Sequence, residues 1–446
     1  MSQTKLKRKI SLLQASAINM TDMVGIGVFV TLGLIAGSMR GYTFLYAWIA
    51  GAVLCYFDAM VYSELGATFP LAGGTYYFLK YGYGEKWGKL MSFLLVWQTM
   101  LQGPLGIASV AIGFTQYAGY IIPLTETTGK ILSVSVVALT VFLLYRRIEA
   151  VAKISVLLWV GVIITIVWII IGGLLHGNFL QPVKKINDGL HLNAGFVAAL
   201  GFASMQTVYS YGGYSNVCSL GSEIINPKKN IPRSIIISLT VIFILFLLLN
   251  ISVASVLPLT TVQHSTFVIS EFMQSIGGKG AANLATGLIL WASFASGFSI
   301  ALACSRVPYA AAVDGAFFKI FAKLHPVRNF PYVSLLVIGA LAIIFTLSLK
   351  LSELISALLA MGILIGSVGP AVGLLLLSRR EGRKAIAWRM LLYPVPVLVA
   401  ILMWLYIFYS TGLAMMTSAI IAICIGAIAY LIQAYRKKEW PFEIKV

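Results

Sequence analysis

The chain has 446 residues, of which 59% are hydrophobic and only 10% are charged, and its mean hydropathy is +0.93. Soluble globular domains carry about 25% charged residues, so this composition excludes a water-soluble protein and predicts many membrane-spanning helices. The net charge of +18 would suit nucleic-acid binding, but the basic residues stand in short clusters between apolar runs, which indicates membrane topology instead.

Apolar runs of about 20 residues cross the hydrocarbon core of a bilayer, and they predict an all-α polytopic membrane protein with twelve transmembrane helices. The expected spans are 11–38, 43–68, 86–121, 130–147, 149–175, 194–222, 234–257, 281–308, 331–349, 352–378, 387–409 and 411–435. If the N-terminus is cytoplasmic, the basic residues left on the other side are few: Arg40, Lys130, Lys184, Lys185, Lys279 and Lys350. The positive-inside rule therefore predicts a protein of the cell (inner) membrane with cytoplasmic tails at 1–10 and 436–446.

The first span contains an interruption, Met-Val-Gly-Ile-Gly-Val-Phe-Val at 23–30. Each Gly costs roughly 1 kcal/mol against Ala inside a helix, and any freed backbone group needs a partner within protein or a water-filled cavity. We therefore expect a broken helix that forms part of a binding site. Close helix packing at Gly25 and Gly27 is the alternative.

The sixth span repeats the interruption at Gly212 and Gly213. Two glycine-interrupted spans in corresponding positions are typical of inverted repeats, with substrate bound where the broken helices meet. The sequence predicts a 5+5 inverted repeat, residues 11–175 and 194–378, with spans 1 and 6 broken. Two peripheral spans at 387–435 are then expected at the edge or on an oligomer surface, and both a monomer and a homo-oligomer remain open.

The connecting segments also carry predictions. Residues 64–88 suit a re-entrant or interfacial segment, and 258–280 has the short helical periodicity of an external lid. Three acidic residues at span ends are expected to form gate and loop ion pairs: Glu64, Glu223 and Asp314. Four cysteines within apolar runs are expected to be core residues without disulfides: Cys55, Cys218, Cys304 and Cys424.

Four blocks of sequence resemble the amino acid, polyamine and organocation (APC) transporter superfamily, and they are most similar to its L-type and bacterial amino acid permease branches. The blocks are Gly-Ile-Gly-Val-Phe at 25–29, Tyr-Ser-Glu-Leu-Gly at 62–66 with Ala-Gly-Gly-Thr-Tyr at 72–76, 209–214 with Asn-Pro-Lys-Lys-Asn-Ile-Pro-Arg-Ser at 226–234, and 305–315. They occur in the family's order and spacing across roughly residues 10–380.

A helix broken at 25–27 exposes free N–H groups and the positive end of a helix dipole, which suit a carboxylate. A break at 210–212 exposes carbonyl oxygens that accept from an ammonium group. A zwitterionic amino acid satisfies both breaks.

The resemblance implies the same division of roles. It assigns substrate binding to Met23, Gly25, Ile26, Gly27, Tyr209, Ser210 and Gly212. Tyr209 corresponds to the aromatic residue that closes over substrate in relatives and is the expected gate, with ordinary aromatic packing as the alternative.

The substrate is expected to be a neutral L-amino acid, because neither break contains the carboxylate that a buried cationic side chain would need. A polyamine or cationic amino acid carrier is the alternative. Selectivity is expected from the pocket floor, which would include Ile107, Ser109, Tyr214 and 293–296.

Coupling to an ion has several candidates. Asp22 and Asp58 are ionisable residues in membrane segments and suit a proton, although Asp58 equally suits a packing role. Ser296 and Ser299 share a helix face and suit sodium, which is the less favoured ion. Many relatives carry a span 5 lysine in place of sodium, but this chain has only apolar residues and Gly161 near Val162.

An enzyme is not expected, because the four histidines lack metal-ligand spacing and no phosphate loop or nucleophile elbow occurs. The sequence predicts a secondary active transporter that works by alternating access, as a proton-coupled symporter or an exchanger, with no cofactor and no metal. Its predicted partners are an amino acid, the lipid bilayer and a coupling proton or sodium ion.

Overall fold

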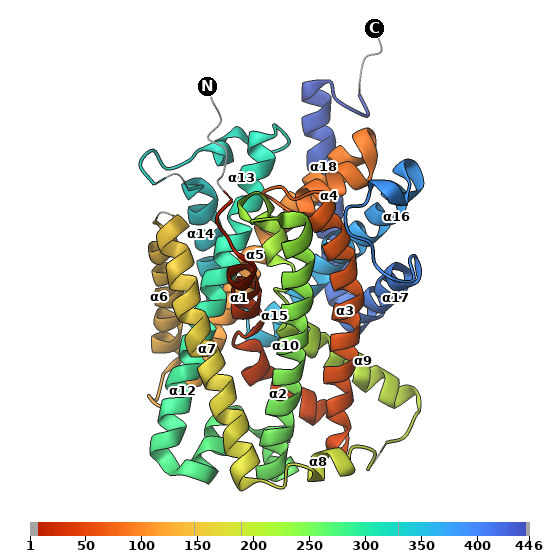
Figure 1. Cartoon of the computed structure of the whole chain (residues 1–446). Coiled ribbons are helices and arrows are strands. Elements are labelled where there is room, and N and C mark those ends of the chain that lie inside the picture. Colours follow the sequence, from red (N-terminus) through yellow and green to blue (C-terminus); the bar gives the residue numbers. More distant parts are fainter. Residues whose placement is uncertain (1–7, 147, 189, 329, 443–446) are drawn as a thin grey trace.

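The computed structural model describes residues 8–146, 148–188, 190–328 and 330–442. The described chain is a bundle of helices that stand side by side (Figure 1). The start of α1 and the end of α18 lie at one end of the bundle with α4 and α13, which we call the terminal end. The opposite end, where α8 lies, is the distal end. Part of each predicted tail, residues 1–7 and 443–446, lies outside the described residues.

The long helices match the predicted spans in order. They are α1 (Leu12–Met23), α2 (Gly27–Ser38), α3 (Leu45–Thr68), α5 (Gly84–Ala118), α6 (Glu126–Leu144), α7 (Ile148–His176), α9 (Ala194–Tyr211), α10 (Pro227–Val256), α12 (Val268–Cys304), α14 (Tyr332–Ser348), α15 (Leu351–Gly362), α16 (Gly369–Glu381), α17 (Val395–Ser410) and α18 (Leu413–Lys437). The π-helix η5 (Ile363–Val368) joins α15 to α16. The shorter elements are η1 (Gly41–Phe44), α4 (Thr75–Gly82), α8 (Gln181–Lys184), η2 (Asn216–Ser219), η3 (Gly221–Glu223), α11 (Leu259–His264), α13 (Arg306–Val313), η4 (Lys319–Ala322) and η6 (Arg383–Ala385).

Within the described residues, eight helices are long and apolar enough to cross a membrane, and α1 with α2 pass the same test as one span bent by 46°. The three remaining predicted spans are the shorter helices α9, α14 and α17, of 18, 17 and 16 residues. The prediction of an all-α polytopic membrane protein is confirmed. The eleventh span begins at Val395 rather than at 387, because residues 387–394 form a bend and a turn.

The sixth span differs from a simple broken helix. Helix α9 ends at Tyr211, and two 3₁₀ turns, η2 and η3, replace a second α-helical half. Gly213 has a φ of +109°, which a side chain would disfavour. The glycine pair therefore ends the helix, and the chain does not resume α-helical geometry until α10.

The segment predicted as a lid contains two short helices at the distal end. Gly278 has a φ of +72° and interrupts α12, so residues 268–277 form a helix separate from the rest of span 8. The carbonyl of Gln263 lies 3.0 Å from where a Cβ of Gly37 would be. The absence of a side chain there lets the lid pack closely on α2.

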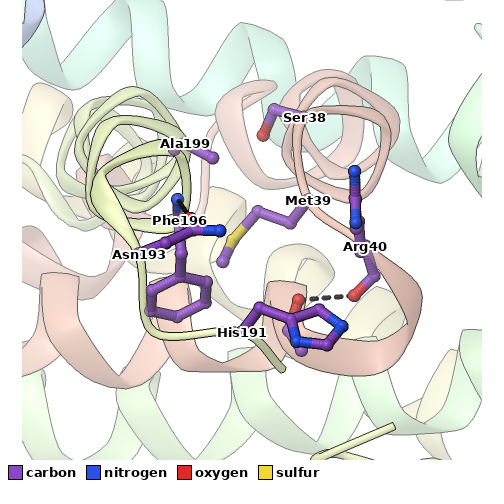
Figure 2. A pocket seen from close by; sticks show the side chains of 9 residues that line it. Ser38, Met39, Arg40, His191, Asn193, Phe196 and Ala199 are labelled. Atoms are coloured by element: carbon purple, nitrogen blue, oxygen red, sulfur yellow. Dashed lines mark hydrogen bonds between the residues drawn. The ribbon is translucent and has the colours of Figure 1, made fainter. Parts of the chain in front are cut away.

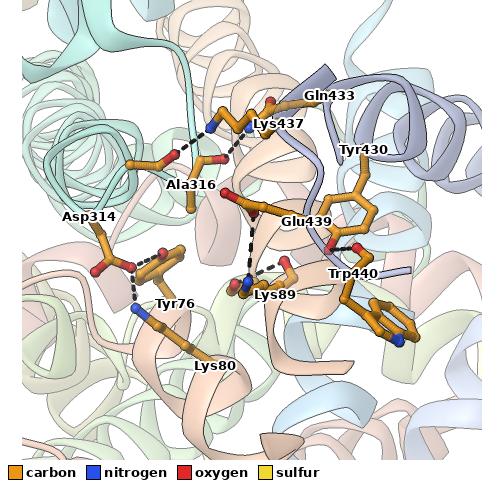
Figure 3. Close-up of polar contacts among 12 residues, drawn as sticks. Tyr76, Lys80, Lys89, Asp314, Ala316, Tyr430, Gln433, Lys437, Glu439 and Trp440 are labelled. Carbon is orange, nitrogen blue, oxygen red and sulfur yellow. Dashed lines mark hydrogen bonds and ion pairs between the residues drawn. The ribbon is translucent and has the colours of Figure 1, made fainter. Parts of the chain in front are cut away.

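Polar contacts join several loops at the terminal end (Figure 3). The Lys80 ammonium lies 2.5 Å from the Asp314 carboxylate, and Lys437 donates to the Gly315 carbonyl at 2.8 Å. Glu64 is fully buried and accepts two hydrogen bonds from Arg383, at 2.6 and 2.7 Å. The predicted ion pairs of Glu64 and Asp314 are confirmed.

The cysteines follow the prediction with one exception. Cys55 and Cys218 are buried and Cys304 is partly buried, and all four thiols are free. Cys424 is exposed on α18, so the prediction of a core position was wrong there. Most of the surface of α18 faces outward, since only 17% of its apolar window is buried.

Candidate functional site

A cavity of about 300 Å³ lies where the two broken spans meet. Small-molecule sites commonly measure roughly 300–1,000 Å³, so the cavity suits a small ligand. Its lining includes Thr75 of α4 and Val307 of α13, and these two helices lie at the terminal end (Figure 1).

The break in span 1 leaves backbone donors free beside this cavity. Helix α1 ends at Met23 and α2 begins at Gly27. Among the described residues, no protein group accepts from the N–H groups of Gly25, Ile26 and Gly27, and all three residues line the cavity. The start of α2 thus offers an anion site of the kind found at helix N-termini.

The break in span 6 supplies acceptors to the same cavity. The N–H of Gly212 donates to the Tyr209 carbonyl at 3.2 Å, and no described N–H donates to the Ser210 carbonyl. The end of α9 carries the negative end of its helix dipole. Opposite partial charges of two helices therefore border the same cavity.

Tyr209 lines the cavity and lies against the break in span 1. Its ring would lie 3.0 Å from a Cβ at Gly27, and its hydroxyl forms a 2.9 Å hydrogen bond with Ser109 of α5. A further hydrogen bond of 3.1 Å joins Thr31 of α2 to Ser210. These contacts tie the two broken spans to each other and to α5.

Asp22 lies at the junction of spans 1, 6 and 8. Its carboxylate accepts from Asn216 at 2.5 Å, and the Ser296 hydroxyl donates to its backbone carbonyl at 3.2 Å. A Cβ at Gly213 would lie 2.7 Å from the Asp22 Cβ. The Asp22 carboxylate therefore touches the second break although it belongs to the first span.

Asp58 lies on another wall of the cavity and is 1% exposed. Tyr214 donates to one carboxylate oxygen at 2.5 Å, and the indole of Trp404 donates to the other at 2.8 Å. Asp58 thus links span 2 to the broken span 6 and to span 11.

The structure brings most of the predicted site residues together. Those lining the cavity are Asp22, Met23, Gly25, Ile26, Gly27, Asp58, Tyr209, Ser210, Gly212, Tyr214 and Ser296. Ile107, Ser293 and Ser299 are buried but lie outside the lining. Gly103, Gly106 and Val110 line the cavity instead, because they occupy the helix face of α5 that turns toward it.

Ser293 is occupied elsewhere, since its hydroxyl donates to the Val110 carbonyl at 3.2 Å. In span 5, Val162 is fully buried. No group of three or more His, Cys, Asp or Glu side chains in the described part of the chain is arranged to hold a metal ion.

Two groups of lining residues that sequence reasoning missed come from the later spans. Trp404 comes from span 11, where no interruption or motif draws attention to it. The π-helix η5 contributes Ile363, Gly366 and Ser367. The sequence signal for the second group was the set of glycines at 362, 366 and 369, which interrupt span 10. Such an interruption is of interest because π-helical segments often occur at functional sites.

A second cavity of about 290 Å³ lies between the end of α2 and the start of α9 (Figure 2). Its lining includes Ser38, Arg40, His191 and Phe196, and the Asn193 side chain accepts from the Phe196 N–H at the start of α9. It belongs to the distal end and shares no lining residue with the cavity between the breaks.

A family model described as "Amino acid permease" matches residues 10–431. The chain belongs to the amino acid permease family. This membership confirms the resemblance to the APC superfamily.

Several curated relatives of this amino acid permease bear specific names. It is 24% identical to the branched-chain amino acid permease BcaP of Bacillus subtilis, over 98% of this chain and 95% of that protein. It is 27% identical to the serine/threonine exchanger SteT of Bacillus subtilis, over 94% and 95% of the two chains. It is 28% identical to mouse cationic amino acid transporter 4, over 84% of this chain but only 60% of that longer protein.

Proposed function

We propose that this permease carries neutral L-amino acids across the plasma membrane by alternating access. The observation that supports the proposal most directly is the pairing of free donors and acceptors in one cavity. The N–H groups of Gly25, Ile26 and Gly27 suit the substrate carboxylate, and the Ser210 carbonyl with its neighbours suits the ammonium group. Both charges of a zwitterion are then held by backbone.

The same cavity supports a transport cycle. It extends to the terminal end, while Tyr209 with Ser109 and the packing of the lid on α2 close the distal side. We infer that 11–175 and 194–378 are inverted repeats that rock around this site. The positive-inside rule puts the terminal end in the cytoplasm, so this conformation faces inward.

A neutral side chain is favoured because both carboxylates on the cavity wall already have partners. Asp22 accepts from Asn216, and Asp58 accepts from Tyr214 and Trp404. An ammonium or guanidinium group would have to compete with these hydrogen bonds. The names of BcaP and SteT also agree with a neutral substrate.

A cationic amino acid or polyamine is the second candidate. The observation that favours it is the position of the Asp22 carboxylate, which lies in the cavity beside the second break. A buried cation seeks such a carboxylate. The name of cationic amino acid transporter 4 is consistent with this alternative.

Uptake into proteoliposomes that contain the purified full chain separates the two candidates. We expect labelled leucine, alanine or serine to enter in exchange for preloaded neutral amino acid, and labelled arginine and putrescine to stay outside. Uptake of arginine or putrescine without neutral amino acids would overturn the proposed substrate class. Replacement of sodium in the same vesicles tests the sodium alternative at Ser296 and Ser299.

A further inference from the structure

Asp58 is a buried carboxylate that the binding of a zwitterion does not use. It lies on the cavity wall, yet its hydrogen bonds go to Tyr214 and Trp404 rather than to either break. A carboxylate in a membrane segment is costly unless it is paired or functional. Its two hydrogen-bond donors are neutral and do not balance its negative charge, which calls for a cationic partner.

No cation within the described residues supplies that partner. None of the ion pairs between the described residues involves Asp58. The titratable groups on which the charge of Asp58 acts are Cys55 and Tyr62 of α3 and Tyr214 and Cys218 after α9. All four are neutral or anionic, and α17 adds only the neutral indole of Trp404. A proton would neutralise the carboxylate without the help of a cationic side chain.

Asp22 suits this role less well. Its carboxylate lies against Gly213 in the break that is proposed to hold the substrate ammonium. A nearby positive charge favours the ionised form of a carboxylate. Asp22 would therefore lose a proton as substrate binds, whereas a symporter must hold proton and substrate together.

We propose that Asp58 binds the proton that this permease transports with its substrate, and that Tyr214 transmits the protonation state of Asp58 to span 6. This inference rests on the proposed function. The carboxylate gains one proton from the distal side and becomes a carboxylic acid. It releases that proton into the cavity when the cavity is open to the terminal end, so one proton crosses for each substrate molecule.

The link to the substrate runs through a short piece of backbone. Tyr214 follows Gly213, whose φ of +109° sits at the break of span 6. Ionised Asp58 accepts a hydrogen bond from the Tyr214 hydroxyl and holds this segment against α3 and α17. Protonated Asp58 offers a donor of its own, which changes that hydrogen bond and frees the segment to move with substrate.

The test uses the full chain in proteoliposomes with a pH step of one unit and no preloaded substrate. One proton per substrate across one unit supports a concentration ratio of up to about tenfold. We expect the wild type to approach this ratio with labelled leucine and Asp58→Asn to stay near an equal concentration on both sides. In parallel vesicles preloaded with leucine, Asp58→Asn should still exchange leucine. Glu126→Gln removes a carboxylate that is 83% exposed and should accumulate leucine as the wild type does.

A second variant keeps the carboxylate and removes one donor. Trp404→Phe deletes the N–H that hydrogen-bonds Asp58 while it retains an aromatic ring. Loss of a donor to the ionised form should shift the pH dependence of accumulation to higher pH, a change that a purely structural role would not produce.

Each outcome is decisive. Three results would overturn the role of Asp58. The first is accumulation by Asp58→Asn as in the wild type, and the second is an unchanged pH profile of Trp404→Phe. The third is an Asp58→Asn variant that has lost both exchange and accumulation. A wild type that exchanges leucine but ignores the pH step would also overturn it, although the proposed function would then stand. A wild type that neither exchanges nor accumulates neutral amino acids contradicts the proposed function itself.

Discussion

Gly25 offers the sharpest test of the break in span 1. Its backbone lies outside the left-handed region, so space alone decides whether a side chain fits. A Cβ there would lie 2.7 Å from the Cβ of Ser296, and ordinary contacts begin at 3.4 Å. Gly25→Ala must therefore push α12 or the break itself out of place.

The expected cost follows from overpacking, which is typically about 1–3 kcal/mol. If the bound conformation bears that cost, substrate affinity should fall by roughly fivefold to 150-fold. The double variant Gly25→Ala with Ser296→Gly removes the atoms that clash and should recover most of the loss. Equilibrium binding of labelled substrate to purified protein measures all three forms.

Gly287→Ala is the matched control, because nothing lies within 4 Å of a Cβ at this helical position in α12. It should bind substrate like the wild type and unfold at the same or a slightly higher temperature. Wild-type affinity in a folded Gly25→Ala variant would refute the reasoning, and so would a double variant as weak as the single one.

Three further predictions concern the closed side, the terminal end and the outer surface. Tyr209→Phe loses the 2.9 Å hydrogen bond to Ser109, worth about 0.5–1.5 kcal/mol net, and should release substrate toward the distal side two- to tenfold faster in efflux assays; an unchanged rate would argue against a gate. Arg383→Gln leaves the buried Glu64 without its cation, so the free energy of unfolding should fall by about 3–5 kcal/mol. The detergent-solubilised variant should then unfold at a lower temperature than the wild type. Arg379→Gln, at an exposed position four residues before Arg383, should unfold like the wild type. A membrane-permeant maleimide should label Cys424 in the folded protein and Cys55 only after unfolding; equal rates would place Cys424 in the core.

The sequence was a good guide wherever backbone chemistry determined the outcome. Glycines at 25, 27, 212 and 213 predicted two breaks, and each break lies on the cavity. Lipid offers no hydrogen-bond partner to the backbone groups that a broken helix frees. Glycine pairs within an apolar span therefore predict a break even when the neighbouring helices are unknown. Asp22 and Asp58 were recognisable for the same reason, since charge is rare in a membrane segment.

The other residues that line the cavity depend on how the helices are rotated and packed, which the sequence of a single span does not determine. Ile107 lies one position from Gly106, yet only Gly106 lines the cavity, because one residue turns a helix face by about 100°. Trp404 lies far from the breaks in sequence and reaches the cavity through the packing of α17 on α3 and η5. No spacing within a single span predicts such contacts.

A competition series with substrate analogues tests the central claim, that two helix breaks hold the two charges of a zwitterion. Leucine, leucinol without the carboxylate, and 4-methylpentanoate without the ammonium group would compete with labelled substrate for the purified protein. Hydrogen bonds to a charged group contribute about 1.5–3 kcal/mol each, so two lost bonds predict at least about a hundredfold weaker binding for either analogue. Binding of leucinol or 4-methylpentanoate within a few fold of leucine would contradict the account.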